Sequence, residues 1–108
     1  MKYLSRQEEL LLLTILKLRD NAYGVPIRDH VSRLTEKHWS IGAVYDTLDR
    51  LTRKGLVEVS ISEPVKARGG RSRRYYHLTR YGFRALEEIR MLQDKIWASF
   101  LEPDFEER

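Results

Sequence analysis

Hydrophobic residues recur with a helical period over most of the chain and with a period of two over one short stretch. Ser5-Arg-Gln-Glu8 matches a capping box, in which the first and fourth residues satisfy each other's backbone N–H groups. Residues 10–18 are leucine-rich and apolar on every side, so they predict a central helix. Asp20-Asn21 indicates a turn. A second helix is expected from Gly24, with Pro26 tolerated in its first turn.

A third helix is predicted over residues 41–54. Ser40 is a favourable N-cap, and Gly55 follows the last turn as a helix stop. The apolar residues of the second and third helices recur at helical spacing, so both helices should pack on one core. The expected core positions are Ile27, Val31 and Leu34 in the second helix and Ile41, Val44, Leu48 and Leu51 in the third.

Residues 56–62 alternate between apolar and polar and predict a strand. Residues 73–78 would return as its antiparallel partner, after a loop that contains Pro64 and Gly69-Gly70. Thr79 can cap a last helix that runs to about Leu101, and Pro103 would end it. We expect residues 104–108 to form a flexible acidic tail.

This order of elements predicts a mainly α fold class with a small antiparallel β-hairpin. Three helices followed by a two-stranded hairpin is the winged helix-turn-helix arrangement. We expect residues 1–78 to form that domain and residues 79–103 to form a C-terminal dimerisation helix. A chain of 108 residues has room for one such domain.

Charge is distributed unevenly along the sequence. The net charge is +4, but no acidic residue occurs between Glu63 and Glu87, where seven arginines and lysines lie, and the rest of the chain carries −3. Arginine, which outnumbers lysine by 14 to 6, suits bidentate contacts with phosphate or guanine. The block indicates a polyanionic partner. The alternative is a basic surface that is merely solvated.

The residue types exclude several other functions. The chain has no cysteine, its three histidines lack the spacing of metal ligands, and no glycine-rich phosphate loop follows a strand. We therefore expect no enzyme activity, no cofactor and no metal. The longest apolar run, residues 10–13, is too short to span a membrane, and the first residues do not resemble a secretory signal. A cytoplasmic location is expected.

The outer face of the third helix is the first candidate site. The second helix of a helix-turn-helix pair enters the major groove of double-stranded DNA. Asp46 and Asp49 oppose phosphate contact, and we interpret them as partners of Arg50 and Arg53 four residues later; the alternative is that Asp46 accepts from a cytosine amino group. An amphipathic helix with solvated arginines would show the same pattern. The candidate DNA-binding residues are Ser40, Gly42, Ala43, Tyr45 and Arg50.

The wing, residues 63–73, is the second candidate site. Five extended residues reach about 16 Å, enough to bring basic side chains to flanking backbone or to a narrow minor groove. Arg73 and Arg74 are consecutive in a strand, so only one of them can face DNA with the loop. A flexible solvated loop is the alternative. The candidate DNA-binding residues here are Lys66, Arg68, Arg71 and Arg73.

The last helix carries an apolar seam with spacings of four, three and four residues, which is typical of helix pairing. A small core cannot cover the whole of its apolar surface, so we expect a homodimer with twofold symmetry. The alternative is a helix that packs along the first helix of the same chain. The expected interface consists of Ala85, Ile89, Leu92, Ile96, Trp97 and Phe100.

The sequence resembles the PadR family of bacterial transcriptional regulators, in its short form with a single C-terminal helix. The resemblance covers nearly the whole chain and lies in Ser40-Ile-Gly-Ala-Val-Tyr-Asp-Thr-Leu-Asp-Arg-Leu51, Lys54-Gly-Leu-Val57, Arg68-Gly-Gly-Arg-Ser-Arg-Arg-Tyr-Tyr76, Leu78-Thr79, Gly82 and Leu86. Many members begin the second helix with Gly-Tyr, whereas here Val25 follows Gly24 and Tyr23 precedes it. Asp46 is also an unusual residue at its position.

The resemblance implies a homodimeric DNA-binding regulator, usually a repressor, that dimerises through its C-terminal helix. Some members bind flat aromatic compounds between aromatic side chains of the dimer interface, and Trp97 could form such an effector pocket here. A tryptophan buried in the dimer without a ligand is the simpler interpretation. A winged helix that binds protein instead of DNA is the alternative function.

Overall fold

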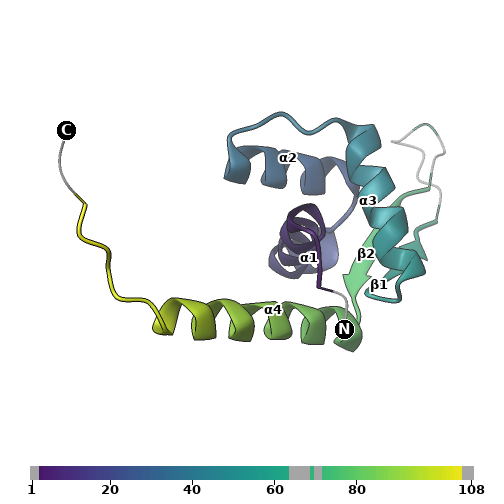
Figure 1. Cartoon of the computed structure of the whole chain (residues 1–108). Helices are drawn as coiled ribbons and strands as arrows, with labels where there is room; N and C mark the ends of the chain where they lie inside the picture. Colours follow the sequence, from purple (N-terminus) through teal and green to yellow (C-terminus); the bar gives the residue numbers. More distant parts are fainter. Residues whose placement is uncertain (1–2, 64–68, 70–71, 106–108) are drawn as a thin grey trace.

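Helix α1 (Arg6–Leu18) begins with the capping box that the sequence predicts. In this computed structural model, which describes residues 3–63, 69 and 72–105, the Glu8 N–H donates to Ser5 Oγ at 3.2 Å and the Ser5 N–H donates to Glu8 Oε1 at 2.8 Å. The helix contacts the other three helices and the second strand of the hairpin, and it lies at the centre of the protein (Figure 1).

A short 3-10 turn, η1 (Arg19–Asn21), leads from α1 to α2 (Gly24–Thr35). Helix α3 (Ile41–Arg53) follows, with Ser40 as its N-cap: the Ser40 hydroxyl accepts from the Ala43 N–H at 3.1 Å. The third helix is one residue shorter than predicted, because Lys54 forms its C-cap. Gly55 then turns the chain with φ of +73°, a conformation that favours glycine.

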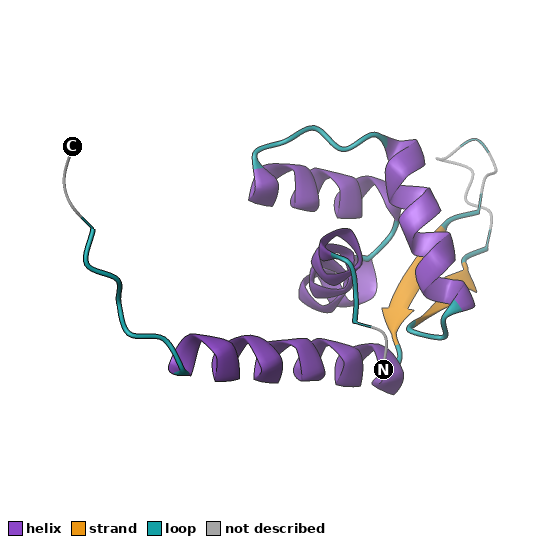
Figure 2. Ribbon diagram, in the orientation of Figure 1, coloured by secondary structure: helices purple, strands orange, loops and turns teal. Residues whose placement is uncertain are grey.

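The two strands β1 (Val57–Ile61) and β2 (Arg74–Leu78) pair antiparallel, with Val59 opposite Tyr76. They lie beside α3, as Figure 2 shows in orange. Each strand is shorter than predicted by one or two residues at its ends. The turn before α2 adds to the hairpin edge, because the Tyr76 N–H donates to the Ala22 carbonyl at 2.8 Å and Tyr23 bridges to Tyr75.

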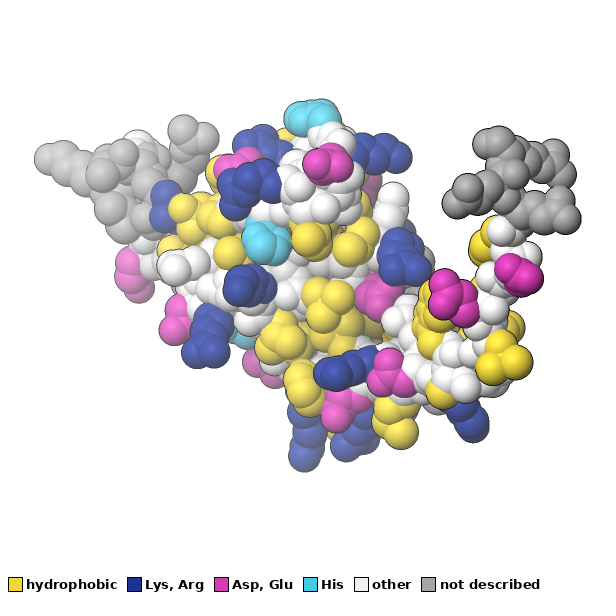
Figure 3. Space-filling model, turned by 90° about the vertical axis from the view of Figure 1, so that its left-hand side faces the viewer, with side chains coloured by type: hydrophobic (Ala, Val, Ile, Leu, Met, Phe, Trp, Pro, Cys, Tyr) yellow, Lys and Arg dark blue, Asp and Glu magenta, His cyan; other side chains and the backbone are white. Residues whose placement is uncertain are grey.

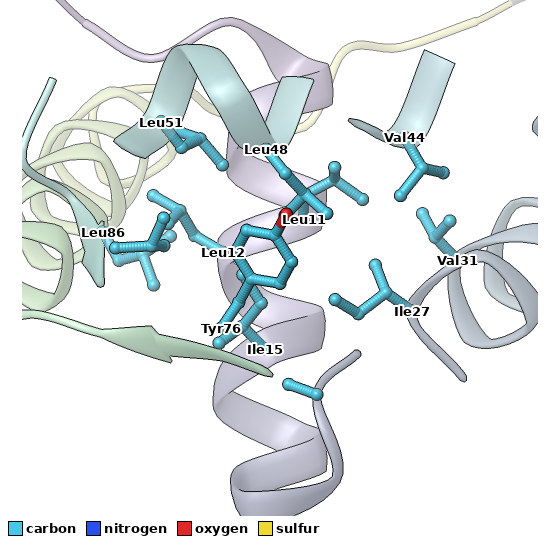
Figure 4. Packing of buried hydrophobic residues seen from close by; sticks show 12 residues of the cluster. Leu11, Leu12, Ile15, Ile27, Val31, Val44, Leu48, Leu51, Tyr76 and Leu86 are labelled. Atoms are coloured by element: carbon cyan, nitrogen blue, oxygen red, sulfur yellow. The ribbon is translucent and has the colours of Figure 1, made fainter. Parts of the chain in front are cut away.

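Apolar side chains from all three N-terminal helices and the hairpin meet around α1 (Figure 4). Two expected core residues are not buried. Leu34 is 58% exposed because it lies in the last turn of α2, which extends past α1, and Ile41 is partly exposed in the first turn of α3 (Figure 1). The buried cluster consists of Leu11, Leu12, Ile15, Ala22, Ile27, Val31, Val44, Leu48, Leu51, Val57, Tyr76 and Leu86.

Helix α4 (Arg80–Ala98) is capped by Thr79, whose hydroxyl accepts from the Gly82 N–H at 3.1 Å. It ends at Ala98 instead of about Leu101, because the Ser99 hydroxyl donates to the Ile96 carbonyl at 2.6 Å and competes for the helical backbone. Its first half packs on α1, whereas its second half and the segment that follows project from the body (Figure 1). The dimensions are 61 × 35 × 20 Å.

Candidate nucleic-acid interface

The outer face of α3 is open to solvent. Gly42, Ala43 and Asp46 are exposed there, and so is Arg53 at the C-terminal end of the helix. A Cβ atom on Gly42 would meet no atom within 4 Å, so this part of the helix has space in front of it. The opposite face, with Val44, Leu48 and Leu51, is fully buried against the core. The first turn of the helix therefore presents the small residues Gly42 and Ala43, which permit close approach to another surface, whereas Asp46 and Arg53 occupy the rest of this face.

Tyr45 occupies the flank of this helix and is 38% exposed. Its ring lies against Gly24, the first residue of α2. A Cβ atom built on Gly24 would be 2.8 Å from the Tyr45 Cζ and nearer still to the hydroxyl oxygen, so a glycine is required for this contact. The tyrosine hydroxyl is thereby held at the start of α2.

Arg50 is engaged by a buried carboxylate. Its Nε lies 3.5 Å from the Oε2 of Glu8, and the Lys54 ammonium donates to the same oxygen. Burial alone would raise the pKa of Glu8, but the hydrogen bonds from Lys54 and Ser5 and the positive charge of Lys54 together lower it. The ion pair expected between Asp46 and Arg50 does not form in the described part of the chain, because Glu8 takes Arg50 instead.

In the wing, the predicted DNA contacts Lys66, Arg68 and Arg71 lie outside the described residues. Gly69, at the tip, has φ of +69°. Arg73 and Arg74 take opposite faces of the hairpin: Arg74 is exposed on the side of Tyr76, and Arg73 is half-buried on the side of Tyr75. The guanidinium carbon of Arg73 lies 4.2 Å from the centre of the Tyr23 ring.

Tyr23 is a member of this site that the sequence interpretation did not include. Its ring also packs edge-on against Tyr75, with 5.4 Å between ring centres. Because Tyr23 and Gly24 are adjacent, Arg73 of the hairpin and Tyr45 of α3 contact neighbouring residues of the same turn. The departure from the Gly-Tyr pattern at this position was the available signal, but sequence alone could not show that Arg73 would reach it.

Helix α4 and the end of α1 carry a large exposed apolar surface. Figure 3 shows apolar side chains across the middle of the face from which the C-terminal end of α4 projects. Ile89 does not belong to this surface: it is 8% exposed, because the first half of α4 packs on α1 within the protomer, and Ala85 and Leu92 are half-buried. The exposed large apolar residues in these segments include Leu13 and Leu16 of α1 and Met91, Ile96, Trp97, Phe100 and Leu101 in and after α4.

Trp97 lines a hollow of about 560 Å³ together with Phe100, Leu101, Glu102 and Pro103. Its ring and that of Phe100 meet edge-on with 6.5 Å between centres. The indole is 76% exposed in the protomer. The hollow is therefore lined mostly by apolar atoms and is open to solvent on one side.

The described residues contain no group of three or more His, Asp or Glu side chains that could hold a metal ion. Within the same ranges, no helix has the length and hydropathy needed to cross a membrane.

Residues 12–88 match the model of the transcriptional regulator PadR-like family. Among solved structures, a PadR family transcription regulator from Clostridium difficile is 28% identical, with a TM-score of 0.66, over 84% of this chain and 91% of that chain. RosR from H. salinarum is 25% identical, with a TM-score of 0.70, over 91% of this chain and 81% of that chain. A PadR-like transcriptional regulator from Bacillus cereus is 24% identical, with a TM-score of 0.68, over 86% and 85%. No curated protein sequence matches the chain.

The helix pair and the adjacent hairpin define a winged helix-turn-helix protein of the kind that regulates transcription. The family match extends over well more than half of the sequence. The chain belongs to the PadR-like family of transcriptional regulators, which confirms the family and the fold class predicted from sequence. Proteins of this family are regulators and not enzymes.

Proposed function

We propose that this regulator binds double-stranded DNA sequence-specifically, with α3 in the major groove and the wing on flanking backbone or in the minor groove. One observation carries the proposal: Arg73 of the hairpin and Tyr45 of α3 converge on the adjacent residues Tyr23 and Gly24. This contact supports a continuous surface from α3 to Arg73 at the base of the wing. Ser40, Gly42 and Ala43 line its α3 side, where small residues permit close approach to base edges.

Arg50 has a different role in this proposal from the other basic residues. Glu8 already neutralises part of its charge, and its side chain is half-buried. We therefore assign it to fixing α3 against α1 and assign the DNA contacts to Arg73 and to Lys66, Arg68 and Arg71 of the wing.

The regulator acts as a homodimeric repressor in this proposal. The exposed half of α4 supports dimer formation, since Ile96, Trp97 and Phe100 are 44%, 76% and 64% exposed in the protomer, and Leu13 and Leu16 of α1 offer a second exposed strip. We place the DNA-binding domain at residues 1–78, the dimerisation helix at 79–103 and the tail at 104–108. Two protomers would present two α3 helices to a pseudo-palindromic site, and a dimer bound at a promoter would block the polymerase.

Selection of bound duplexes from a random pool tests sequence specificity, and binding of the selected duplex measured against salt tests the electrostatic part. If the dimer neutralises about six to ten phosphates, affinity should fall about 10³- to 10⁵-fold between 50 and 200 mM salt. Ala43→Trp should abolish binding of the selected duplex while leaving the melting temperature unchanged, because Ala43 is exposed. A flat salt response, or a variant that binds as well as the wild type, would refute the proposal.

The alternative function, a protein-binding winged helix, predicts no binding to any DNA duplex. Such a module needs no acid-free segment with seven basic residues beside the hairpin. Binding to a partner protein with no affinity for any duplex would favour it.

The hollow beside Trp97 supports a flat aromatic effector as part of the same proposal. Its apolar wall and the exposed indole would suit a stacked ring. Quenching of the Trp97 fluorescence by a planar dye, lost in Trp97→Leu, would support this role. Quenching that persists in Trp97→Leu would assign the signal to Trp39.

A further inference from the structure

Tyr23, Arg73 and Tyr75 form a cluster where the wing joins the rest of the domain. The Arg73 guanidinium carbon is 4.2 Å from the centre of the Tyr23 ring, well within the range of a cation–π contact. Tyr75 supports the other side of the arrangement by packing edge-on against Tyr23, with 5.4 Å between ring centres. The arginine is therefore held against an aromatic platform.

The backbone around the cluster is fixed as well. The Arg73 N–H donates to Ser62 Oγ at 2.9 Å, and the Ser62 N–H donates to the Arg73 carbonyl at 2.9 Å. On the other side, Tyr23 bridges to Tyr75, and the Tyr76 N–H donates to the Ala22 carbonyl at 2.8 Å. Arg73 and the Tyr23 ring are therefore both attached to hydrogen-bonded backbone, so these residues lose little conformational entropy when a ligand binds.

The charge of Arg73 is not neutralised by an ion pair with any of the described residues. The Tyr23 ring lies against the guanidinium carbon, and the N–H donors of the guanidinium form no hydrogen bond with a described residue. They remain available to an oxyanion. A planar fork of donors held in one orientation matches the geometry of a phosphate group.

We infer that Tyr23 is a positioning residue that holds Arg73 in place to bind a backbone phosphate of the DNA. This inference rests on the proposed function. Arg73 adjoins the turn that Tyr45 also contacts, so its phosphate would flank the groove that α3 occupies. The same cluster assigns Arg73 to the DNA and leaves Arg74 on the opposite face of the hairpin, beside Tyr76.

The test is the affinity of the full chain for a fluorescent duplex of mixed sequence, measured from about 50 to about 200 mM salt, where phosphate contacts set the slope. Arg73→Ala should weaken binding about tenfold and reduce the salt slope by about 1 for each protomer bound. Tyr23→Leu should weaken it about two- to tenfold and reduce the slope similarly, because the released guanidinium no longer faces the phosphate. Tyr23→Phe keeps the ring and should restore most of the loss.

Two matched control variants remove an aromatic ring and a positive charge at positions outside this cluster. Tyr81→Leu removes an exposed ring that also lies near arginines, and Arg90→Ala removes an exposed positive charge from α4. Both should leave affinity and slope unchanged. The double variant Tyr23→Leu with Arg73→Ala should bind no more weakly than Arg73→Ala, because both changes remove one contact.

The inference is overturned if the wild type binds the duplex and Tyr23→Leu keeps its affinity and slope, or if Tyr23→Phe loses as much as Tyr23→Leu. Should Tyr23→Leu fail to fold, Arg73→Ala tests the inference instead, because an unchanged salt dependence of duplex affinity in that variant would also overturn it. A wild-type chain that binds no duplex refutes the proposed function itself, which is a different result.

Discussion

The ring of Tyr45 in α3 packs directly against Gly24, the first residue of α2, which has no side chain to hold the ring away. A Cβ atom at this position would be 2.8 Å from the Tyr45 Cζ. The contact fixes the Tyr45 side chain beside Tyr23 and Gly24, the turn that Arg73 of the hairpin also contacts.

Gly24→Ala should therefore displace Tyr45 without unfolding the protein. We expect a cost of about 1–2 kcal/mol in the free energy of unfolding, since the half-exposed ring can swing toward solvent, together with weaker DNA binding. Urea denaturation and duplex titration measure the two effects. Gly42→Ala is the control: it meets open space and should stabilise α3 by about 0.5–1 kcal/mol. Equal stability losses in the two variants would contradict the assignment.

Gly82→Ala should be more damaging than Gly24→Ala. A Cβ atom on Gly82 would collide with the backbone carbonyl of Leu56 and lie 2.7 Å from Leu78 Cδ1, and a backbone group cannot swing away. We expect a loss of about 3 kcal/mol or more, visible as a large fall in the thermal midpoint. A midpoint close to that of the wild type would mean that α4 can move off the hairpin freely.

Glu8→Gln should reduce stability at neutral pH and flatten its acid dependence. Glutamine preserves the capping box but removes the charge that Lys54 and Arg50 contact. Because the pKa of Glu8 is lowered in the folded state from its ordinary 4.5, its contribution is fully present above that pH and is lost as the pH falls through the folded pKa.

The expected loss at neutral pH is about 1–2 kcal/mol, reduced by the partial exposure of the two cations. Denaturation curves measured at several pH values check it. Glu9→Gln, which breaks the 3.6 Å pair with the exposed Arg6 guanidinium, is the control and should change stability by no more than about 0.5 kcal/mol. An acid dependence identical to that of the wild type in Glu8→Gln would show that the ion pairs carry no net stability.

Tyr76→Phe should be tolerated although Tyr76 is fully buried. Its hydroxyl forms no hydrogen bond of good geometry with a described residue, and burial raises its pKa although the Arg74 guanidinium nearby lowers it in part. Removing an unpaired polar group should be neutral or stabilise the fold by up to about 1 kcal/mol. Urea midpoints compare it with Tyr76→Leu, which should lose stability through a cavity. A marked loss in Tyr76→Phe would reveal a partner for the hydroxyl.

Replacing both Trp97 and Phe100 by serine should convert the proposed dimer to a monomer. Both side chains are exposed in the protomer, so the protomer itself should keep its fold. Sedimentation should then give the mass of one chain, 12.9 kDa. Tyr81→Ser, an exposed aromatic elsewhere on α4, should not change the mass. A wild-type chain that already sediments as a monomer would refute the dimer.

Sequence periodicity predicted every regular element of the described chain except the 3-10 turn, because capping and alternation are local properties. Ser5, Ser40 and Thr79 each cap the helix that they were expected to cap. The errors lie at the ends of elements, where a single side chain such as the Ser99 hydroxyl decides between continuing and stopping.

Contacts between distant segments were not predictable in the same way. Nothing in the spacing of Glu8 indicates that Lys54, 46 residues later, would approach it. Ile89 has the spacing of an interface residue and is buried within its own protomer, because a heptad-like pattern does not say which helix covers it. The stacking of Arg73 on Tyr23 likewise depends on how the hairpin crosses the turn before α2.

The close packing at Gly82 anchors α4 at its N-terminal end, while its C-terminal end projects from the body. Thr79 donates its N–H to Leu56 O at 3.1 Å and its hydroxyl to Gly55 O at 2.7 Å, so the first turn of α4 is clamped to the base of the hairpin. Beyond it, 19 helical residues extend about 28 Å. A tilt of about 5° at the clamp would move the far end by roughly 2.5 Å over that length, so the contacts of the first half of α4 with the hairpin and α1 determine where its far end lies.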